Sequence, residues 1–107
     1  MIDSTVVGGV ILVSGMQKVI AASNLSISQN KTCTLIFPAA IRSADRGAGY
    51  VLAERVKGAE NSLKVKAGRP DFKPSSLTVI TTDGQVFSLL VSYTAHPPYL
   101  VLDFRGK

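Results

Sequence analysis

From residue 31 onward, apolar and polar residues alternate with a period of two, the pattern of half-buried β-strands. Over residues 32–37, Cys33, Leu35 and Phe37 share one face, and Pro38 ends the strand because proline cannot donate to a ladder. A second strand is predicted over residues 61–67. Its apolar residues face the core and its lysines face solvent: Leu63, Val65 and Ala67 against Lys64 and Lys66.

A β-hairpin is predicted over residues 77–82 and 85–94, two β-rich runs separated by Asp83 and Gly84. This dipeptide suits a type I′ turn, in which both central residues have positive φ. The second strand places four apolar residues on one face, opposite Ser88 and Ser92: Phe87, Leu89, Val91 and Tyr93.

The remaining segments carry weaker strand patterns. Residues 99–104 are predicted as a last strand after the break at residues 96–98, with Leu100, Leu102 and Phe104 on one face. Residues 39–42 and 49–54 are expected to flank a turn at residues 45–47, and residues 50–56 also allow a short helical turn. A further turn is expected at residues 58–61.

The amino-terminal segment, residues 1–30, is nearly uncharged, since Lys18 is its only ionisable side chain between residues 4 and 30. Its apolar run over residues 6–13 is far shorter than the roughly 20 residues of a membrane helix. The run resembles the apolar centre of a signal peptide, but a signal peptide has basic residues before this centre. Here the preceding residues contain Asp3 and neither Lys nor Arg. We therefore expect β-structure leading into the domain.

These patterns together predict one all-β domain over residues 1–107, an immunoglobulin-like β-sandwich of about seven to nine strands. A hydrophobic fraction of 46% with 18% charged residues is that of a globular protein. The net charge of +5 is spread along the chain with acidic residues between the basic ones, so direct nucleic-acid contact is not expected.

The candidate chemistry is sparse. One cysteine and one histidine exclude a disulfide framework and most metal sites within the chain. Cys33 alternates with Leu35 on the predicted buried face and is expected to pack as a small hydrophobe, and His96 to be a solvated side chain. We predict no enzymatic activity, no catalytic residue, no cofactor and no metal site.

One group of residues has the character of a binding surface. Lys64, Lys66, Arg69 and Lys73 lie on or just after one predicted strand, and we name these four residues the basic face. The alternative is that these residues bind no partner and only form a solvated strand face, whose charges discourage edge-to-edge aggregation of sheets.

Residues 31–42, KTCTLIFPAAIR, resemble the start of the amino-terminal domain of the TraN proteins of Bacteroides-type conjugative transposons. There, a strand ending in Ile-Phe-Pro precedes a small residue, an apolar residue and Arg. The resemblance extends over residues 31–104 and includes a Gly-Ala-Glu-Asn turn and Lys-Val-Lys strand at residues 58–67 and the segments 75–79 and 83–93. More distantly, the outline is similar to the CagX-type outer-membrane core subunit of type IV secretion systems.

The resemblance implies a non-enzymatic assembly domain of a conjugative DNA-transfer apparatus. Its location would be the periplasm or cell envelope, peripheral to the outer membrane, and its partners other conjugation proteins and further copies of itself. The alternative is a stand-alone extracytoplasmic module that binds carbohydrate or peptide, although the absence of tryptophan disfavours sugar. The third alternative is a fragment of an enzyme, which is disfavoured because the chain has one histidine and one cysteine from which to form a catalytic site.

Overall fold

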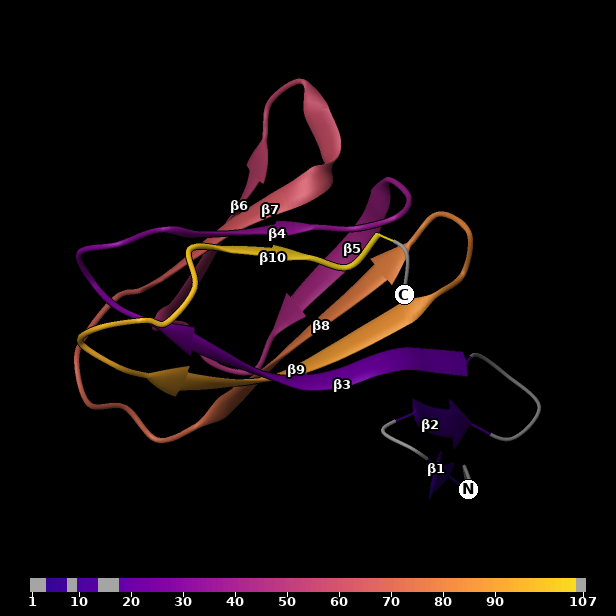
Figure 1. Cartoon of the computed structure of the whole chain (residues 1–107), viewed down its shortest axis with the longest axis horizontal. Coiled ribbons are helices and arrows are strands. Elements are labelled where there is room, and N and C mark those ends of the chain that lie inside the picture. Colours follow the sequence, from indigo (N-terminus) through magenta and orange to yellow (C-terminus); the bar gives the residue numbers. More distant parts are fainter. Residues whose placement is uncertain (1–3, 8–9, 14–17, 106–107) are drawn as a thin grey trace.

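The computed structural model describes residues 4–7, 10–13 and 18–105. These residues form strands and loops with no helix, so none of them belongs to a helix that is long and apolar enough to cross a membrane (Figure 1). The strands are β1 Ser4–Val7, β2 Val10–Val13, β3 Lys18–Ile27, β4 Cys33–Ile36, β5 Ile41–Arg46, β6 Val51–Val56, β7 Ala59–Ala67, β8 Ser75–Thr81, β9 Val86–Tyr93 and β10 Val101–Asp103.

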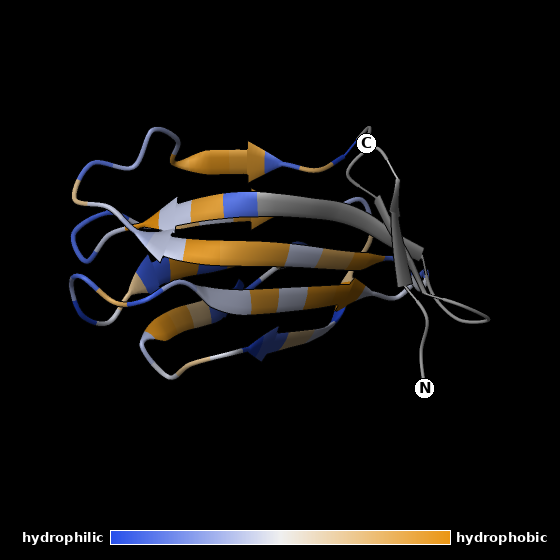
Figure 2. Ribbon diagram, turned by 90° about the horizontal axis from the view of Figure 1, so that it is seen from below, coloured by the Kyte–Doolittle hydropathy of each residue, from blue (hydrophilic) through white to orange (hydrophobic). Residues whose placement is uncertain are grey.

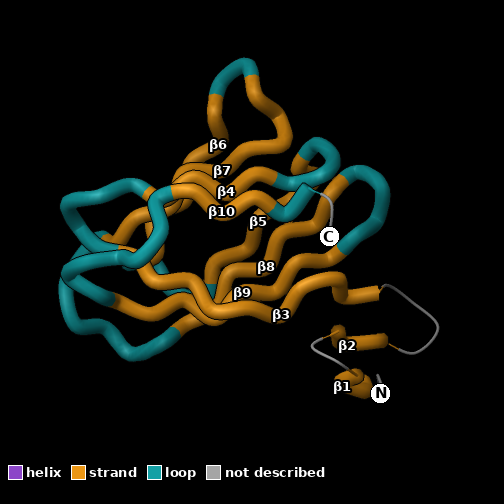
Figure 3. The backbone as a smooth tube through the Cα atoms, viewed as in Figure 1, coloured by secondary structure: helices purple, strands orange, loops and turns teal. Residues whose placement is uncertain are grey.

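The strands form two mixed sheets that face each other across the hydrophobic core (Figure 3). The larger has the order β1-β2-β3-β9-β8-β5, and the smaller has the order β10-β4-β7-β6. Figure 2 shows hydrophobic and polar residues alternating along the strands, as the period-two pattern predicts. The all-β class expected from the sequence is therefore confirmed.

The centre of the core is aromatic. Phe37, at the end of β4, is fully buried and packs edge-on against Phe87 at 5.0 Å between ring centroids. Phe104, after β10, stacks on Phe37 at 5.3 Å and lies 5.6 Å from Phe87. Such ring pairs add about 0.5–1.5 kcal/mol each beyond the burial of their area. They join both sheets, because β4 and β9 belong to different ones.

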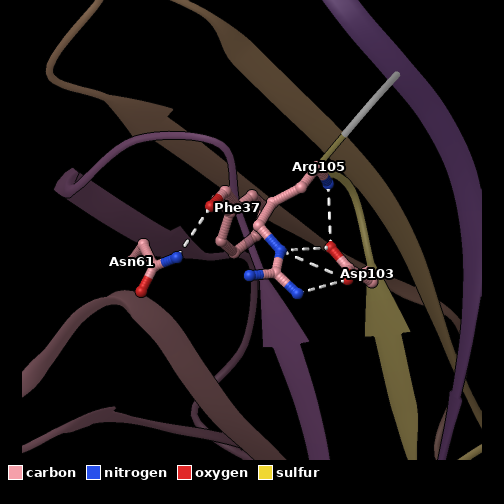
Figure 4. A network of polar contacts seen from close by, with 4 residues as sticks. All are labelled: Phe37, Asn61, Asp103 and Arg105. Carbon is pink, nitrogen blue, oxygen red and sulfur yellow. Dashed lines mark hydrogen bonds and ion pairs between the residues drawn. The ribbon is translucent and has the colours of Figure 1, made fainter.

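The facing predicted for β4 and β7 is confirmed. The apolar residues Cys33, Leu35, Phe37, Leu63, Val65 and Ala67 are all buried. Lys64 and Lys66 are exposed on the other face of β7. Asn61 joins the two strands at the end of β4: its side-chain amide donates to the Phe37 carbonyl at 3.0 Å, and its own carbonyl accepts from the Phe37 N–H at 2.8 Å (Figure 4).

The β8–β9 hairpin is confirmed, but its predicted turn type is wrong. Gly84 has φ of +84°, whereas Asp83 does not have positive φ. The Gly84 N–H donates to the Thr81 carbonyl at 2.9 Å and the Thr81 N–H donates to the Gln85 carbonyl at 3.0 Å. This is a three-residue loop with glycine in the left-handed position, a type I turn followed by a bulge. The Asp83 carboxylate accepts from the Thr81 hydroxyl, which favours this turn.

The turn predicted at residues 45–47 is also wrong. Asp45 and Arg46 belong to β5, where they pair with Thr78 and Leu77 of β8. Long-range pairing therefore overrides the local turn signal of these polar residues. The helical alternative for residues 50–56 is wrong as well, since β6 is a strand. The turn predicted at residues 58–61 is found at residues 57–58, because β7 already begins at Ala59.

Two pairs of strands are parallel, and each pair joins strands that lie far apart in the sequence. β3 pairs with β9 from Val19 to Ile27, and β10 pairs with β4. The expected β-structure of the amino-terminal segment is present in β1, β2 and β3, while residues 8–9 and 14–17 lie outside the described residues. The predicted facing of the last strand is partly wrong, because Phe104 is buried but Leu100 is 48% exposed.

Candidate functional site

The structure divides the basic face into two pairs of residues. Lys64 and Lys66 project from the outer side of the smaller sheet, while Arg69 and Lys73 lie in the loop that joins β7 to β8. All four residues are exposed, as predicted for Lys64 and Lys66. The Arg69 guanidinium lies 4.7 Å from the centre of the Tyr50 ring, and the Tyr50 hydroxyl donates to the Lys73 carbonyl at 3.2 Å. The loop pair is thus organised around Tyr50.

The sheet pair borders a shallow hollow of about 320 Å³, lined by Thr32, Arg46, Leu52, Ala53, Glu54, Lys64, Val65 and Lys66. Lys64 forms an ion pair with Glu54 at 3.2 Å, between side chains that are 45% and 75% exposed. Exposed pairs of this kind contribute little to stability. The hollow therefore holds three cations and one carboxylate, a surface that attracts anions weakly.

Arg46 is the cation of this hollow that the sequence does not indicate, because the local pattern predicts a turn at residues 45–47. Its guanidinium donates to the Val51 carbonyl of β6 at 3.0 Å. In the opposite direction, Arg55 of β6 donates to the carbonyls of Ile41 and Arg42 on β5, at 3.0 and 3.2 Å. Since β5 and β6 are the outer strands of the two sheets, these arginines bridge and cap one side of the molecule.

The opposite side of the molecule is open and apolar. A groove of about 240 Å³ lies between β3 and the chain leading into β10, lined by Asn24, Leu25, Ser26, Pro98, Tyr99 and Leu102. Three consecutive apolar residues beside it are exposed: Tyr99 by 64%, Leu100 by 48% and Val101 by 56%. We name the groove lined by the six residues from Asn24 to Leu102 given above the β3–β10 groove. The sequence does not indicate this groove, because the alternation over residues 99–104 predicts a strand with one buried face.

The reactive side chains named from the sequence lie apart. Cys33 is buried, as predicted, and burial raises the pKa of its thiol, so it is a poor nucleophile. His96 is exposed in the loop after β9. Among residues 24–105, whose side chains are described, no three His, Cys, Asp or Glu residues cluster in a way that could hold a metal ion.

A second exposed ion pair of the described residues joins Asp103 and Arg105 at the end of β10 (Figure 4). The Arg105 guanidinium donates to both carboxylate oxygens, at 2.7 Å from Nη2 and 3.0 and 3.2 Å from Nε. Hydrogen bonds from the Arg105 side chain and backbone lower the pKa of Asp103 to about 2. Asp103 and Arg105 thus neutralise each other at the end of β10.

Residues 25–97 match a protein family described as a domain of unknown function (DUF8473). The chain belongs to this family. No curated protein matches its sequence. The family match begins within β3 and ends after β9, so it includes the basic face and both bridging arginines.

The β3–β10 groove, by contrast, lies across the boundary of the family match. Leu25 and Ser26 are inside the matched range, and Asn24, Pro98, Tyr99 and Leu102 are outside it. The strands β1, β2 and β10 also lie outside the range. The open side is therefore built where the family domain meets its flanking segments.

Proposed function

We propose that this domain is a non-enzymatic assembly module of a conjugative, type IV secretion-like DNA-transfer apparatus in the cell envelope. It acts through protein–protein contacts, in the periplasm and peripheral to the outer membrane. The lineage rests on the resemblance of residues 31–104 to the TraN amino-terminal domain. The observation that carries the assembly role is the β3–β10 groove together with the exposed run Tyr99, Leu100 and Val101 at its border, since contiguous exposed apolar surface marks interaction sites.

The fold we infer is an immunoglobulin-like sandwich. Constant-type immunoglobulin domains have strands A, B, E and D in one sheet and C, F and G in the other. If β4 to β9 are read in order as strands B to G, the sheets become β10-B-E-D and β1-β2-β3-G-F-C. In this reading β10 takes the place of strand A beside B, and β3 runs parallel to G.

A pull-down from an envelope extract of a strain that carries the conjugative element tests the function. The matched baits are the native chain and the double variant Leu100→Ser, Val101→Lys, which removes apolar surface without touching a buried residue. Recovery of other conjugation proteins by the native bait, and their loss with the variant, is the expected result. Recovery of only glycans or host peptides would instead favour the stand-alone binding module and overturn the proposal.

A further inference from the structure

Among the described strands, none pairs with the carboxyl half of β3 on the side away from β9, and we call this side of residues 24–27 its free edge. Residues 24–27 pair with β9 on one side, whereas the two pairs that join β2 to β3 reach only Lys18 and Val19. The Thr94 N–H donates to the Ile27 carbonyl at 2.9 Å, which continues the parallel ladder. Backbone groups alternate in direction along such a ladder, so the N–H and C=O of Asn24 and Ser26 point away from β9. These groups are available to another strand.

The β3–β10 groove lies against this free edge. Its lining contains no Lys, Arg, Asp, Glu or His, and its apolar residues that reach the surface are Pro98, Tyr99 and Leu102, since the Leu25 side chain is buried in the core. The side of the molecule bridged by Arg46 and Arg55 is charged instead, and there the two guanidinium groups donate to backbone carbonyls of the outer strands β5 and β6. A segment that fills the groove must therefore be extended, apolar and uncharged.

Residues 4–13 of the chain have this chemistry. They contain no ionisable side chain, and β2 is a continuous run of Val, Ile, Leu and Val. Continuous apolar runs are typical of strands covered on both faces. Within its own chain, the described residues of β2 and β3 form two pairs, at Ile11 and Leu12.

We propose that β2 of a second copy of this chain adds to residues 24–27 of β3 and covers the β3–β10 groove. The second copy extends an association already present in the fold, since β2 is the strand that pairs with the start of this same β3 edge. The move exchanges the two described intrachain residue pairs for as many as four, because β2 and residues 24–27 are equally long. This inference rests on the proposed assembly function and names a partner for it.

Sedimentation velocity on the purified full chain, over a range of concentrations, measures the association. Ser26→Pro removes an N–H that points to the free edge and adds a ring there, while the β9 ladder keeps its donors. The matched control is Ser26→Ala, which retains the N–H. We expect the native chain and Ser26→Ala to dimerise, and Ser26→Pro to weaken dimerisation by at least tenfold. A native chain that stays monomeric, or equal dimerisation by the two variants, would overturn the proposal.

Cross-linking identifies the strand that binds, and it does not depend on the stability of the proline variant. Chains with Ile11→Cys are mixed with chains with Ser26→Cys and treated with a short bismaleimide, while the native Cys33 stays protected by burial. We expect a covalent heterodimer, and at least tenfold less product when Lys66→Cys replaces Ser26→Cys. The proposal fails if no heterodimer forms, or if the two cysteines react only when both are placed in one chain.

These experiments use purified protein, so their failure leaves the pull-down result unaffected. If partners are recovered from the envelope while the chain remains monomeric, the assembly function stands and the homotypic contact is wrong. If the chain dimerises through β2 and no conjugation protein is recovered, the contact stands and the conjugation role is wrong.

Discussion

Leu89 and Leu90 are neighbours in β9 that point to opposite faces of the larger sheet. The Leu89 side chain is 1% exposed and belongs to the core, whereas Leu90 is 50% exposed. Aspartate at either position adds the same charge to the same strand, so the pair isolates the effect of burial. We expect Leu89→Asp to unfold the domain and Leu90→Asp to leave it folded.

The magnitude follows from the position of Leu89. Removing a buried leucine side chain costs about 2–5 kcal/mol, and burying an unpaired carboxylate costs several kcal/mol more. A chain of 107 residues has a total free energy of unfolding of about 5–16 kcal/mol. The cost of Leu89→Asp is therefore comparable to the whole stability, whereas an exposed substitution stays within about 0.5 kcal/mol.

Thermal unfolding followed by circular dichroism at pH 7 measures both variants, with Leu89→Ala as an intermediate case. A loss of about 3 kcal/mol in Leu89→Ala corresponds to a Tm lower by roughly 15 °C. A native-like Tm for Leu89→Asp would refute the facing of β9. Equal damage by Leu90→Asp would refute the claim that this face is solvated.

Three further predictions concern the bridge, the thiol and the surface ion pair. Arg55→Ala removes the side-chain hydrogen bonds to the Ile41 and Arg42 carbonyls and lowers the free energy of unfolding in urea by about 1–2 kcal/mol; an unchanged midpoint would contradict the bridge. Cys33 should react with a thiol reagent only as fast as the domain unfolds, and rapid reaction of the native protein would contradict its burial. The pKa of Asp103 is depressed to about 2, so its stabilising contribution is present above about pH 4 and is lost as the pH falls toward 2. Arg105→Ala should return this pKa toward 3.8, which an NMR titration of the carboxyl carbon measures.

The position and facing of several strands could be read from the chain alone. In β4, β7 and β9 the alternation of side chains identifies the buried face, because successive residues of any strand point to opposite sides. The β8–β9 hairpin could also be predicted, since Asp83 and Gly84 interrupt two β-rich runs. The turn type could not be predicted, because the Asp-Gly dipeptide is compatible with several turns, and hydrogen bonds of Thr81 with Asp83, Gly84 and Gln85 stabilise one of them.

The candidate surfaces divide in the same way. The exposure of Lys64 and Lys66 follows from their alternation with Val65, so this part of the basic face was visible in the sequence. The arginine bridge and the β3–β10 groove were not visible, because each joins residues from strands far apart in the chain.

Alternation therefore determines which face of a strand is apolar, and turn residues determine where a strand ends. Neither determines which strand becomes its neighbour, or in which direction. The parallel pairs β3–β9 and β10–β4 join segments from opposite ends of the chain, and they exist because both sheets must cover one core around Phe37, Phe87 and Phe104. Local patterns act over a few residues, whereas strand pairing depends on the total apolar area that the whole chain can bury.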